Sequence, residues 1–292
     1  MPSERLGVGF VRWAPKGTYS RFVGFWARRT VPRGLRARLY SRFARRFGIE
    51  LAEVERPLDE YPSFDAFFTR RLRSGARPID PADDVAISPV DGTVVESGIA
   101  VGGRLIQAKG IDYTLRGLLI DPDEAQRFTG GAYVTLYLAP RDYHRIHSPA
   151  GGDVIAWRHV PGAVFPVNPP SVRHVPGLFA RNERLITYLQ TSFGRMAVVK
   201  VAATGVSDIT CAYDPSVRTR QTRRTRRVDY ETARPVGKGD ELGAFHLGST
   251  VIVLFEHGRV VLEPLAAGQR VLMGQAIARK AATTAGADDA AA

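Results

Sequence analysis

The chain has 292 residues, and its hydrophobic fraction of 44% excludes a disordered protein and allows one sizeable core with an appendage. The formal net charge is +12, and the single cysteine, Cys211, excludes an internal disulfide and is expected to be a small buried residue. No run of roughly 18 apolar residues occurs, so we expect no spanning helix, and frequent charges near the N-terminus do not fit a secretory signal.

The first 48 residues carry most of the charge. They hold eleven arginines and one lysine against the single acid Glu4, a net of +11, which leaves +1 for the other 244 residues. Apolar side chains recur there at helical spacing on both sides of Pro32: Tyr19, Phe22, Val23, Trp26, Leu35, Leu39, Phe43 and Phe47. The pattern predicts two short basic amphipathic helices that lie on an anionic membrane surface. Alternatively, the aromatic face packs on the protein's own core and the arginines are solvated.

After residue 48 the pattern changes. Ser63 is a plausible N-cap for a short helix that ends near Leu72, and further helical pieces are expected over 113–119 and 123–127. Strands are predicted between turn residues, over 85–87, 93–96, 104–109, 133–138, 152–159, 186–191, 195–201, 250–255 and 260–262. No Gly-rich phosphate loop and no regular β-α alternation occurs. We therefore predict an α+β protein, with N-terminal helices and a compact, barrel-like, mostly antiparallel β core. Residues 281–292 are expected to form a disordered tail.

A second basic cluster lies in a threonine-rich segment. It comprises Arg218, Arg220, Arg223, Arg224, Arg226 and Arg227. Six arginines in ten residues could bind phosphate groups. No aromatic residues interleave with them and no nucleic-acid-binding motif occurs, so we expect no nucleic-acid partner. The default expectation is a solvated loop between strands.

Gly248 and Ser249 directly precede the apolar run 250–255. In this position Ser249 Oγ can add to the carbonyl of Gly248, which converts the peptide bond into an ester. Loss of the serine α-proton then expels the upstream acid and leaves dehydroalanine, which tautomerises to an imine; water hydrolyses the imine to a pyruvoyl group and releases ammonia. A glycine upstream tolerates the twisted backbone that this attack requires. From these residues alone, an ordinary Gly-Ser turn before a buried strand is the alternative.

His147 is the candidate general base for Ser249, because the ordinary pKa of histidine lies near neutrality. Asp91 would orient the imidazole and stabilise the cation that forms, although an Asp-Gly pair is also a common turn. His144 and His147 could instead bind a metal, but no cysteine pair or acidic partner lies near them at ligand spacing, so we expect no metal. The remaining histidines are expected to be structural: His159, His174, His246 and His257.

Five motifs occur in order along the chain. They are Ser88-Pro89-Val90-Asp91-Gly92-Thr93, Tyr143-His144-Arg145-Ile146-His147-Ser148-Pro149, Phe165-Pro166-Val167-Asn168-Pro169, Leu178-Phe179-Ala180-Arg181-Asn182-Glu183-Arg184 and Leu247-Gly248-Ser249-Thr250. Together they resemble the phosphatidylserine decarboxylases, from about Phe64 to about Gln275. Two further segments fit the same pattern: Phe67-Phe68-Thr69-Arg70 and Gly75-Ala76-Arg77-Pro78-Ile79.

The resemblance implies the same Asp91, His147 and Ser249 set. It also implies self-cleavage between residues 248 and 249 into a large β chain (1–248) and a small α chain (249–292), which stay together as a heterodimer. Further dimerisation is left open.

The resemblance further implies the decarboxylation of phosphatidylserine to phosphatidylethanolamine. The pyruvoyl carbonyl at Ser249 would form a Schiff base with the substrate amine and accept the electrons left by carbon dioxide. Covalently bound pyruvate would be the cofactor, with no pyridoxal phosphate and no metal. His144 is the candidate proton donor to the resulting carbanion. Phe165, Val167 and Asn168 are candidates for the headgroup pocket, although core packing explains Phe165 and Val167 equally well.

The predicted division is thus a membrane-associating segment (1–48) and a catalytic domain (49–280), followed by the tail. We expect a peripheral protein on the cytoplasmic face of the cell membrane. A serine hydrolase that uses the same residues without self-cleavage is an alternative, but the Gly-x-Ser-x-Gly elbow is missing. A non-enzymatic basic protein bound to membrane or nucleic acid is another. A pyruvoyl decarboxylase of a soluble amino acid is a nearer alternative, though its substrate would not require the basic helices.

Overall fold

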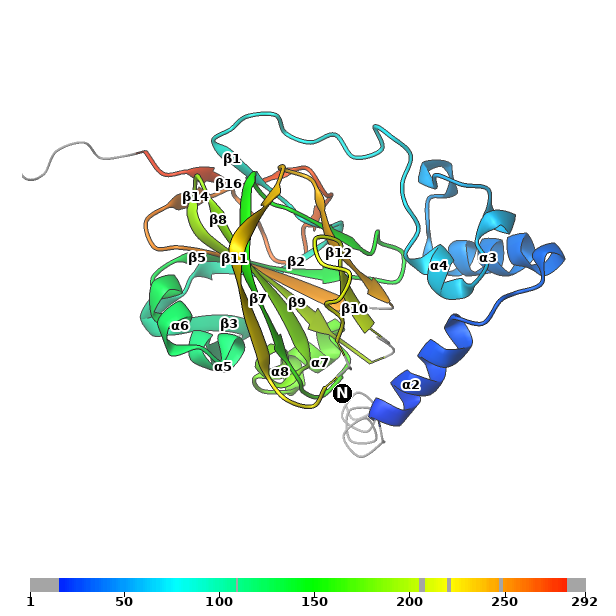
Figure 1. The fold of residues 1–292 in the computed structure, drawn as a ribbon, viewed down its shortest axis with the longest axis horizontal. Helices are drawn as coiled ribbons and strands as arrows, with labels where there is room; N and C mark the ends of the chain where they lie inside the picture. Colours follow the sequence, from blue (N-terminus) through cyan, green and yellow to red (C-terminus); the bar gives the residue numbers. More distant parts are fainter. Residues whose placement is uncertain (1–15, 109, 205–207, 220–221, 247–248, 283–292) are drawn as a thin grey trace, which may run out of the picture.

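The computed structural model describes residues 16–108, 110–204, 208–219, 222–246 and 249–282. Within these ranges the chain forms a small helical region beside a larger β core, and Figure 1 shows the helical region at one end of the sheets. Gly248 and most of the predicted tail lie outside the described residues.

The helical region contains both predicted amphipathic helices. Helix α2 spans Lys16–Ala27 and helix α3 spans Arg33–Phe47. Pro32 directly precedes α3. Proline is tolerated there, because a backbone N–H at the start of a helix has no partner within the helix. Gly48 ends α3 in the left-handed conformation, with φ of 76°, and donates its N–H to Ala44 O. The two predicted helices are therefore confirmed.

A third helix, α4 (Phe64–Phe68), begins where the sequence predicted. Ser63 accepts a hydrogen bond from Ala66 N at 3.2 Å, as an N-cap does. The helix ends before the predicted Leu72, because Leu72 pairs with Val54 in an isolated β-bridge and is therefore extended. Two short 3₁₀ turns lie between α3 and α4: η1 (Leu51–Glu53) and η2 (Leu58–Glu60).

The helices of this region pack around their own small hydrophobic cluster. Its buried members are Tyr40, Ala44, Ile49, Val54, Tyr61 and Phe67. The rings of Tyr40 and Phe67 stack at 4.9 Å. This cluster is separate from the large cluster that fills the β core, so the two regions have distinct hydrophobic interiors.

The β core is built on an eight-stranded antiparallel sheet in the order β11-β7-β8-β9-β13-β5-β2-β15. Its strands are β2 (Gly92–Ile99), β5 (Ala132–Leu138), β7 (Gly152–Val160), β8 (Arg184–Thr191), β9 (Gly194–Ala202), β11 (Arg226–Val236), β13 (Ser249–Phe255) and β15 (Arg270–Val271). Strand β13 is central and all seven of its residues are buried. Such a continuous apolar strand fits only the middle of a covered sheet.

Smaller sheets and short helices complete the core. The sheets join β1 (Val85–Ile87), β16 (Ala276–Lys280) and β14 (Val260–Leu262); β10 (Asp208–Cys211), β12 (Glu241–His246) and β6 (Arg145–His147); and β3 (Arg104–Ala108) and β4 (Ile111–Thr114). The helical elements are η3 (Val101–Gly103), α5 (Leu115–Leu119), α6 (Pro122–Phe128), α7 (Pro169–His174) and α8 (Leu178–Arg181). In Figure 1, β10 and β12 lie at the end of the core that faces α2 and α4.

The predicted α+β class with mostly antiparallel strands is confirmed. The large sheet does not close into a barrel in the described part of the chain, since β11 and β15 remain its two edges. The segment predicted as a helix over 113–119 begins as the end of β4 and becomes helical at Leu115, where Thr114 caps α5 by accepting a hydrogen bond from Gly117 N.

The default expectation of a solvated loop for the second basic cluster is wrong for three of its arginines: Arg226 and Arg227 lie on β11, and the charge of Arg218 is paired. Arg227 lies on β11 and forms ion pairs with Asp121 and with Asp229, the latter at 2.6 Å. Arg218 forms an ion pair with Asp208 at 2.8 Å. The carboxylates that hold these side chains are distant in the sequence, except for Asp229, so the arginine run alone could not reveal them.

Candidate active site

Ser249 is the first residue of β13 and is completely buried. It pairs with Leu138 on β5 and with Ala202 on β9, so the most central strand of the sheet holds its backbone on both sides. Its Oγ has no hydrogen-bond partner among the described residues. An unpartnered buried hydroxyl destabilises a fold by about 1–3 kcal/mol, and such an exception is expected where a group is kept for chemistry.

His144 lies in the turn that follows β5, and its ring is fully buried against Phe68, with 4.1 Å between ring centroids. Its Nδ1 lies 2.8 Å from the backbone oxygen of Asp142. Because that carbonyl can only accept, Nδ1 carries the proton in the neutral ring and Nε2 carries the lone pair. Nε2 has no partner in the described ranges, and burial lowers the pKa of His144 to about 3. His144 is therefore a neutral ring with a free proton-accepting nitrogen.

His147 lies on β6 and is also neutral, but both of its nitrogens are engaged. Nδ1 donates to the backbone oxygen of Gly239 at 2.7 Å, and Nε2 accepts from the hydroxyl of Tyr143 at 3.1 Å. Burial lowers the pKa of His147, and the negative charges of Glu241 and Asp91 oppose that shift. Burial also raises the pKa of Tyr143 to about 12, so the phenol keeps its proton and donates it to the imidazole.

Asp91 is buried and its carboxylate is fully occupied. Arg77 Nε donates to Oδ1 at 2.8 Å, Arg77 Nη2 donates to Oδ2 at 2.6 Å, and the backbone N–H of Met273 donates to Oδ1 at 2.9 Å. The same guanidinium also holds Glu53 through Nη1 and Nη2. Asp91 is thus one end of a Glu53–Arg77–Asp91 ion-pair chain that links the helical region to the core.

The structure brings the predicted site residues to one end of the core without joining them into a chain of hydrogen bonds. Asp91 and His147 approach through the backbone, since His147 N donates to Pro89 O at 2.8 Å. The charge of Asp91 also partly opposes the lowering of the pKa of His147 by burial. Their side chains make no hydrogen bond to each other or to Ser249 in the part of the chain that is described. The bond from Phe245 N to His144 O ties the His144 turn to β12, which ends just before Ser249.

The proposed headgroup residues lie in the segment before α7. Val167 is buried in the main hydrophobic cluster, and Asn168 caps α7 by accepting from Ser171 N at 3.1 Å. Core packing and capping explain both positions without a ligand. Phe165 is partly buried, and the guanidinium of Arg181 lies 4.8 Å from its ring centroid.

Asn182 connects this segment to the position opposite Ser249. Its side chain accepts from Phe165 N and donates to Phe165 O, both at 2.9 Å, and it also donates to Ala202 O at 2.8 Å. Ala202 is the β9 partner of Ser249. Sequence reasoning missed this role, although Asn182 stands inside one of the five motifs.

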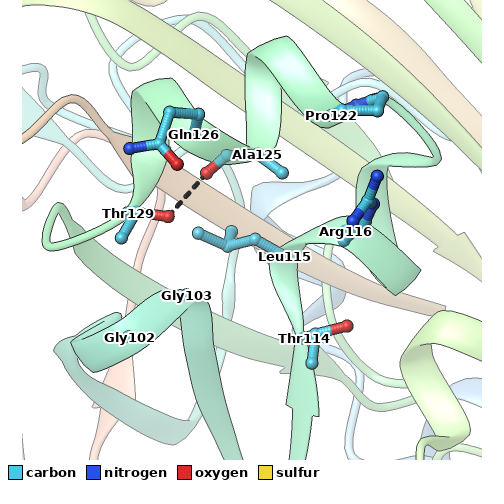
Figure 2. Close-up of a pocket in the computed structure, with 9 residues that line it drawn as sticks. All are labelled: Gly102, Gly103, Thr114, Leu115, Arg116, Pro122, Ala125, Gln126 and Thr129. Carbon is cyan, nitrogen blue, oxygen red and sulfur yellow. Dashed lines mark hydrogen bonds between the residues drawn. The ribbon is translucent and has the colours of Figure 1, made fainter.

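Two of the molecule's cavities are lined entirely by described residues. One, of about 250 Å³, lies between the helical region and the core and is lined by Asp91, Arg77 and Tyr143, among others. The other, of about 370 Å³, lies between η3, α5 and α6 and contains none of the predicted site residues (Figure 2). Thr129 in its wall donates to Ala125 O at 2.8 Å, so that hydroxyl is satisfied within the protein. Of these two cavities, the first adjoins the candidate site.

The fold and the site together define the class: an α+β enzyme that buries a serine at the head of its central strand and buries two neutral histidines in and beside β6. The family model described as phosphatidylserine decarboxylase matches residues 64–279. The phosphatidylserine decarboxylase proenzyme of Anaeromyxobacter sp. (strain K) is 53% identical over 276 residues, which are 94% of this chain and 98% of that protein. The proenzyme of Myxococcus xanthus is 48% identical over 247 residues, covering 84% and 88%.

A more distant relative, the phosphatidylserine decarboxylase proenzyme of Brevibacillus brevis, is 40% identical over 283 residues, covering 96% of this chain and 99% of that protein. The chain therefore belongs to the phosphatidylserine decarboxylase family and is an enzyme, which confirms the resemblance seen in its motifs. In the described ranges no helix is long and apolar enough to cross a membrane, and no three His, Cys, Asp or Glu side chains are grouped as a metal site.

Proposed function

We propose that the chain cuts itself between Gly248 and Ser249 and then decarboxylates phosphatidylserine to phosphatidylethanolamine. Family membership and the description of its relatives as proenzymes support this proposal. The structural observation that carries it is the buried Oγ of Ser249, which has no hydrogen-bond partner in the described residues and stands at the first position of β13. A hydroxyl kept buried without a partner is free to attack the adjoining backbone.

The self-cleavage needs a base for the Ser249 proton. We assign His147 to this role and Asp91 to the stabilisation of the imidazolium that forms. Burial lowers the pKa of His147, and the charge of Asp91 is among the contributions that oppose this shift. The hydrogen bond from Tyr143 to His147 Nε2 must open before His147 can act. His144 Nε2 has no such partner among the described residues, which makes His144 the second candidate for the base.

Ser249 fits the formation of a pyruvoyl group, because cleavage there leaves its carbon skeleton at the new N-terminus of a seven-residue buried strand. Such a group supplies a carbonyl that condenses with an amine and withdraws electrons as carbon dioxide leaves. His144 would move the protons: its free Nε2 accepts one from the substrate ammonium and can then return one to carbon. Because burial keeps this ring neutral, it must accept a proton before it can donate. Phe165, Val167 and Asn168 remain candidates for the headgroup pocket.

We propose peripheral binding to an anionic membrane, at its cytoplasmic face, and the exposed apolar side chains of the helical region support the membrane contact. Several large apolar side chains on α2 and α3 are exposed: Phe22, Phe25, Trp26, Leu35, Leu39 and Phe47. Phe22 and Trp26 are 63% and 59% exposed, and the guanidinium of Arg29 lies 4.2 Å from the ring centroid of Phe25, which is also exposed. Aromatic side chains with neighbouring arginines suit the headgroup layer of anionic lipid. We propose residues 1–48 as the membrane segment and 49–280 as the catalytic domain.

The test of self-cleavage is the intact mass of the purified chain under denaturing conditions. We expect two fragments, residues 1–248 and 249–292, with the second lighter than simple hydrolysis predicts by one ammonia. Ser249→Ala should remain one chain and release no carbon dioxide from phosphatidylserine vesicles. A cleaved Ser249→Ala protein would overturn the proposed chemistry, and an uncut wild type that hydrolyses esters without releasing carbon dioxide would favour the hydrolase-type alternative.

The substrate is tested separately on the cleaved enzyme. Phosphatidylserine in vesicles and free serine are offered at equal concentration, and carbon dioxide release is measured. Release from the lipid alone supports the proposal. Faster release from free serine would instead identify a decarboxylase of a soluble amino acid.

A further inference from the structure

Arg70 is a buried guanidinium with unused donors. The residue is only 3% exposed, and it lies just after α4, where the helical region meets the core. Nη2 donates to the backbone oxygens of Arg141 and Asp142 at 3.1 and 3.3 Å. Nε and Nη1 have no hydrogen-bond partner in the described part of the chain. Since a buried cation is expected to be paired, two empty donors on Arg70 call for an acceptor.

The carboxylates near Arg70 are committed to other groups. Glu53 and Asp91 are both bound by Arg77. Asp142 accepts from Ala139 N through Oδ2. Its Oδ1 makes no hydrogen bond among the described residues, but it lies within ion-pair distance of Arg270 Nη2, at 3.2 Å, and of Arg141 Nε, at 3.7 Å. None of these carboxylates lies within ion-pair distance of Arg70 in the described structure. Burial lowers the pKa of Arg70, which is the direction expected for a cation that lacks a direct counterion.

The side chain of Arg70 lines the cavity of about 250 Å³ between the two regions. Arg141 and Arg270 line the same cavity, and their side chains are 44% and 45% exposed, so they lie toward solvent while Arg70 lies on the buried side. Glu50 is also part of the wall, but it is exposed and accepts from Ala52 N. Three guanidinium groups at different depths of one hollow can surround a single tetrahedral anion.

We propose that this cavity binds one phosphate-type oxyanion, held by Arg70 from the buried side and by Arg141 and Arg270 from the solvent side. The anion would bridge the helical region and the turn that carries His144. Its source is either the phosphodiester of a phospholipid headgroup or free inorganic phosphate. The cavity lies next to the proposed membrane-binding surface, because Gly48 in its wall directly follows Phe47, one of the exposed aromatic residues of α3. This position favours a lipid headgroup as the source. The binding depends on neither self-cleavage nor decarboxylation.

The test is calorimetric titration of the full-length protein with inorganic phosphate, with sodium chloride at matched ionic strength as the reference. Wild type should bind one phosphate saturably, both as the cleaved enzyme and as the uncut Ser249→Ala chain. Arg270→Gln and Arg141→Gln are expected to weaken binding about tenfold or more. Both arginines also pair with the buried Asp142, so the folding of each variant is checked by urea unfolding before titration. Arg70→Lys keeps the charge but loses the planar fork, and it should weaken binding at least as much. Arg116→Gln, in the wall of the other cavity (Figure 2), is the matched control and should bind as wild type does.

A second titration identifies the source. Short-chain phosphatidylglycerol, which has a phosphodiester but no serine, is added to the phosphate complex below its micelle concentration. Displacement of phosphate supports a lipid headgroup as the occupant, and saturable phosphate binding without displacement supports the free anion. Absence of saturable phosphate binding to wild type would overturn the proposal, as would equal affinity in wild type, Arg270→Gln and Arg70→Lys. Either result would leave the mass and carbon dioxide measurements on the cleaved enzyme unaffected.

Discussion

The helical region and the β core differ in how completely they bury their apolar side chains. The core covers its most apolar strand on both sides and leaves no residue of β13 accessible to solvent. The helical region has a cluster of only six buried residues, while Phe22 and Trp26 on its outer face remain more than half exposed. A closely packed interior can hold the backbone at Ser249 in a fixed position for reaction. Exposed apolar side chains, in contrast, suit a surface that binds to the apolar part of a membrane.

The contacts between these two regions are largely polar. His246 Nδ1 lies 2.9 Å from both carboxylate oxygens of Asp65, and Arg145 Nε donates to Thr69 O at 3.0 Å. Phe68 is an exception, since it packs on the ring of His144. Polar contacts fix orientation while adding little hydrophobic stabilisation, so changes in one region are expected to leave the interior of the other intact. The predictions below test this separation.

The largest expected effect lies in the core, where the two histidines should separate cleavage from decarboxylation. His147→Ala is expected to slow self-cleavage by about 10²–10⁴-fold, the usual contribution of a general base. His144→Ala should still cleave, but its carbon dioxide release from phosphatidylserine should fall by a similar factor. Intact mass against time measures the first rate, and carbon dioxide release from the cleaved fraction measures the second. Normal processing of His147→Ala together with an uncut His144→Ala would show that His144 is the base.

The next largest effect concerns the ion-pair chain that crosses from the helical region to the core. Arg77→Met removes the partner of the buried Asp91 carboxylate and should lower the free energy of unfolding by about 3–5 kcal/mol, because it leaves an uncompensated buried charge. Urea unfolding in the Ser249→Ala background, where a single chain is expected, measures this change. Arg104→Met breaks the exposed pair with Asp112 and should alter stability little. Equal stabilities for the two variants would mean that Asp91 does not need Arg77.

The third effect belongs to the helical region alone. The double change Phe22→Ser and Trp26→Ser should weaken binding to anionic vesicles about a hundredfold, since burial of a large apolar side chain contributes about 1.5–3 kcal/mol. Self-cleavage should proceed at the wild-type rate. Vesicle co-sedimentation with intact mass on the same sample measures both. Val261→Ser, which changes a side chain that is 63% exposed on the core, is the matched control and should bind as wild type does. Equal vesicle binding by the double variant and wild type would contradict a membrane role for α2.

The two regions also differ in which signals in the sequence predict their secondary structure. Helices α2 and α3 and the start of α4 follow from local signals, namely apolar spacing, Pro32 and the Ser63 cap. Strand β13 follows from an unbroken apolar run. The sequence does not predict the short strands β6 and β12, because three to six residues carry no clear period. They become strands through pairing with distant segments, β6 with β12 and β12 also with β10.

The candidate site, too, can be predicted only in part from the sequence. Ser249, His144 and His147 are recognisable from their motifs, and the structure buries all three. Their partners are not recognisable, because partner choice depends on how distant segments meet. Tyr143 directly precedes His144 in the sequence, yet its hydroxyl forms a hydrogen bond with the ring of His147, four residues further along the chain. Arg77 lies in a motif that was noted, but its role emerges only from the carboxylates of Glu53 and Asp91 around it.

The smallest effect is a pH dependence of stability that originates in the core. Burial lowers the pKa of His144 to about 3, below its ordinary value of 6.5, so between these values the unfolded chain binds a proton that the folded chain does not. The stabilisation is therefore fully present above about pH 6.5 and declines as the pH falls toward 3. The slope contributed by one such histidine approaches about 1.4 kcal/mol per pH unit. The lowered pKa of His147 acts in the same direction.

Urea unfolding of the Ser249→Ala chain between pH 7 and pH 5 measures this slope, in a window chosen to lie above the ordinary titration range of carboxylates. His144→Gln should reduce the slope of the unfolding free energy against pH by the contribution of close to one bound proton, about 1.4 kcal/mol per pH unit. Phe68→Leu is the matched control, because it loosens the packing on the same ring but keeps the imidazole, so it should lower stability without changing the slope. If His144→Gln and Phe68→Leu gave the same slope, the buried imidazole would not be the group that loses its proton on folding, and its assignment as a neutral proton acceptor would fail with it.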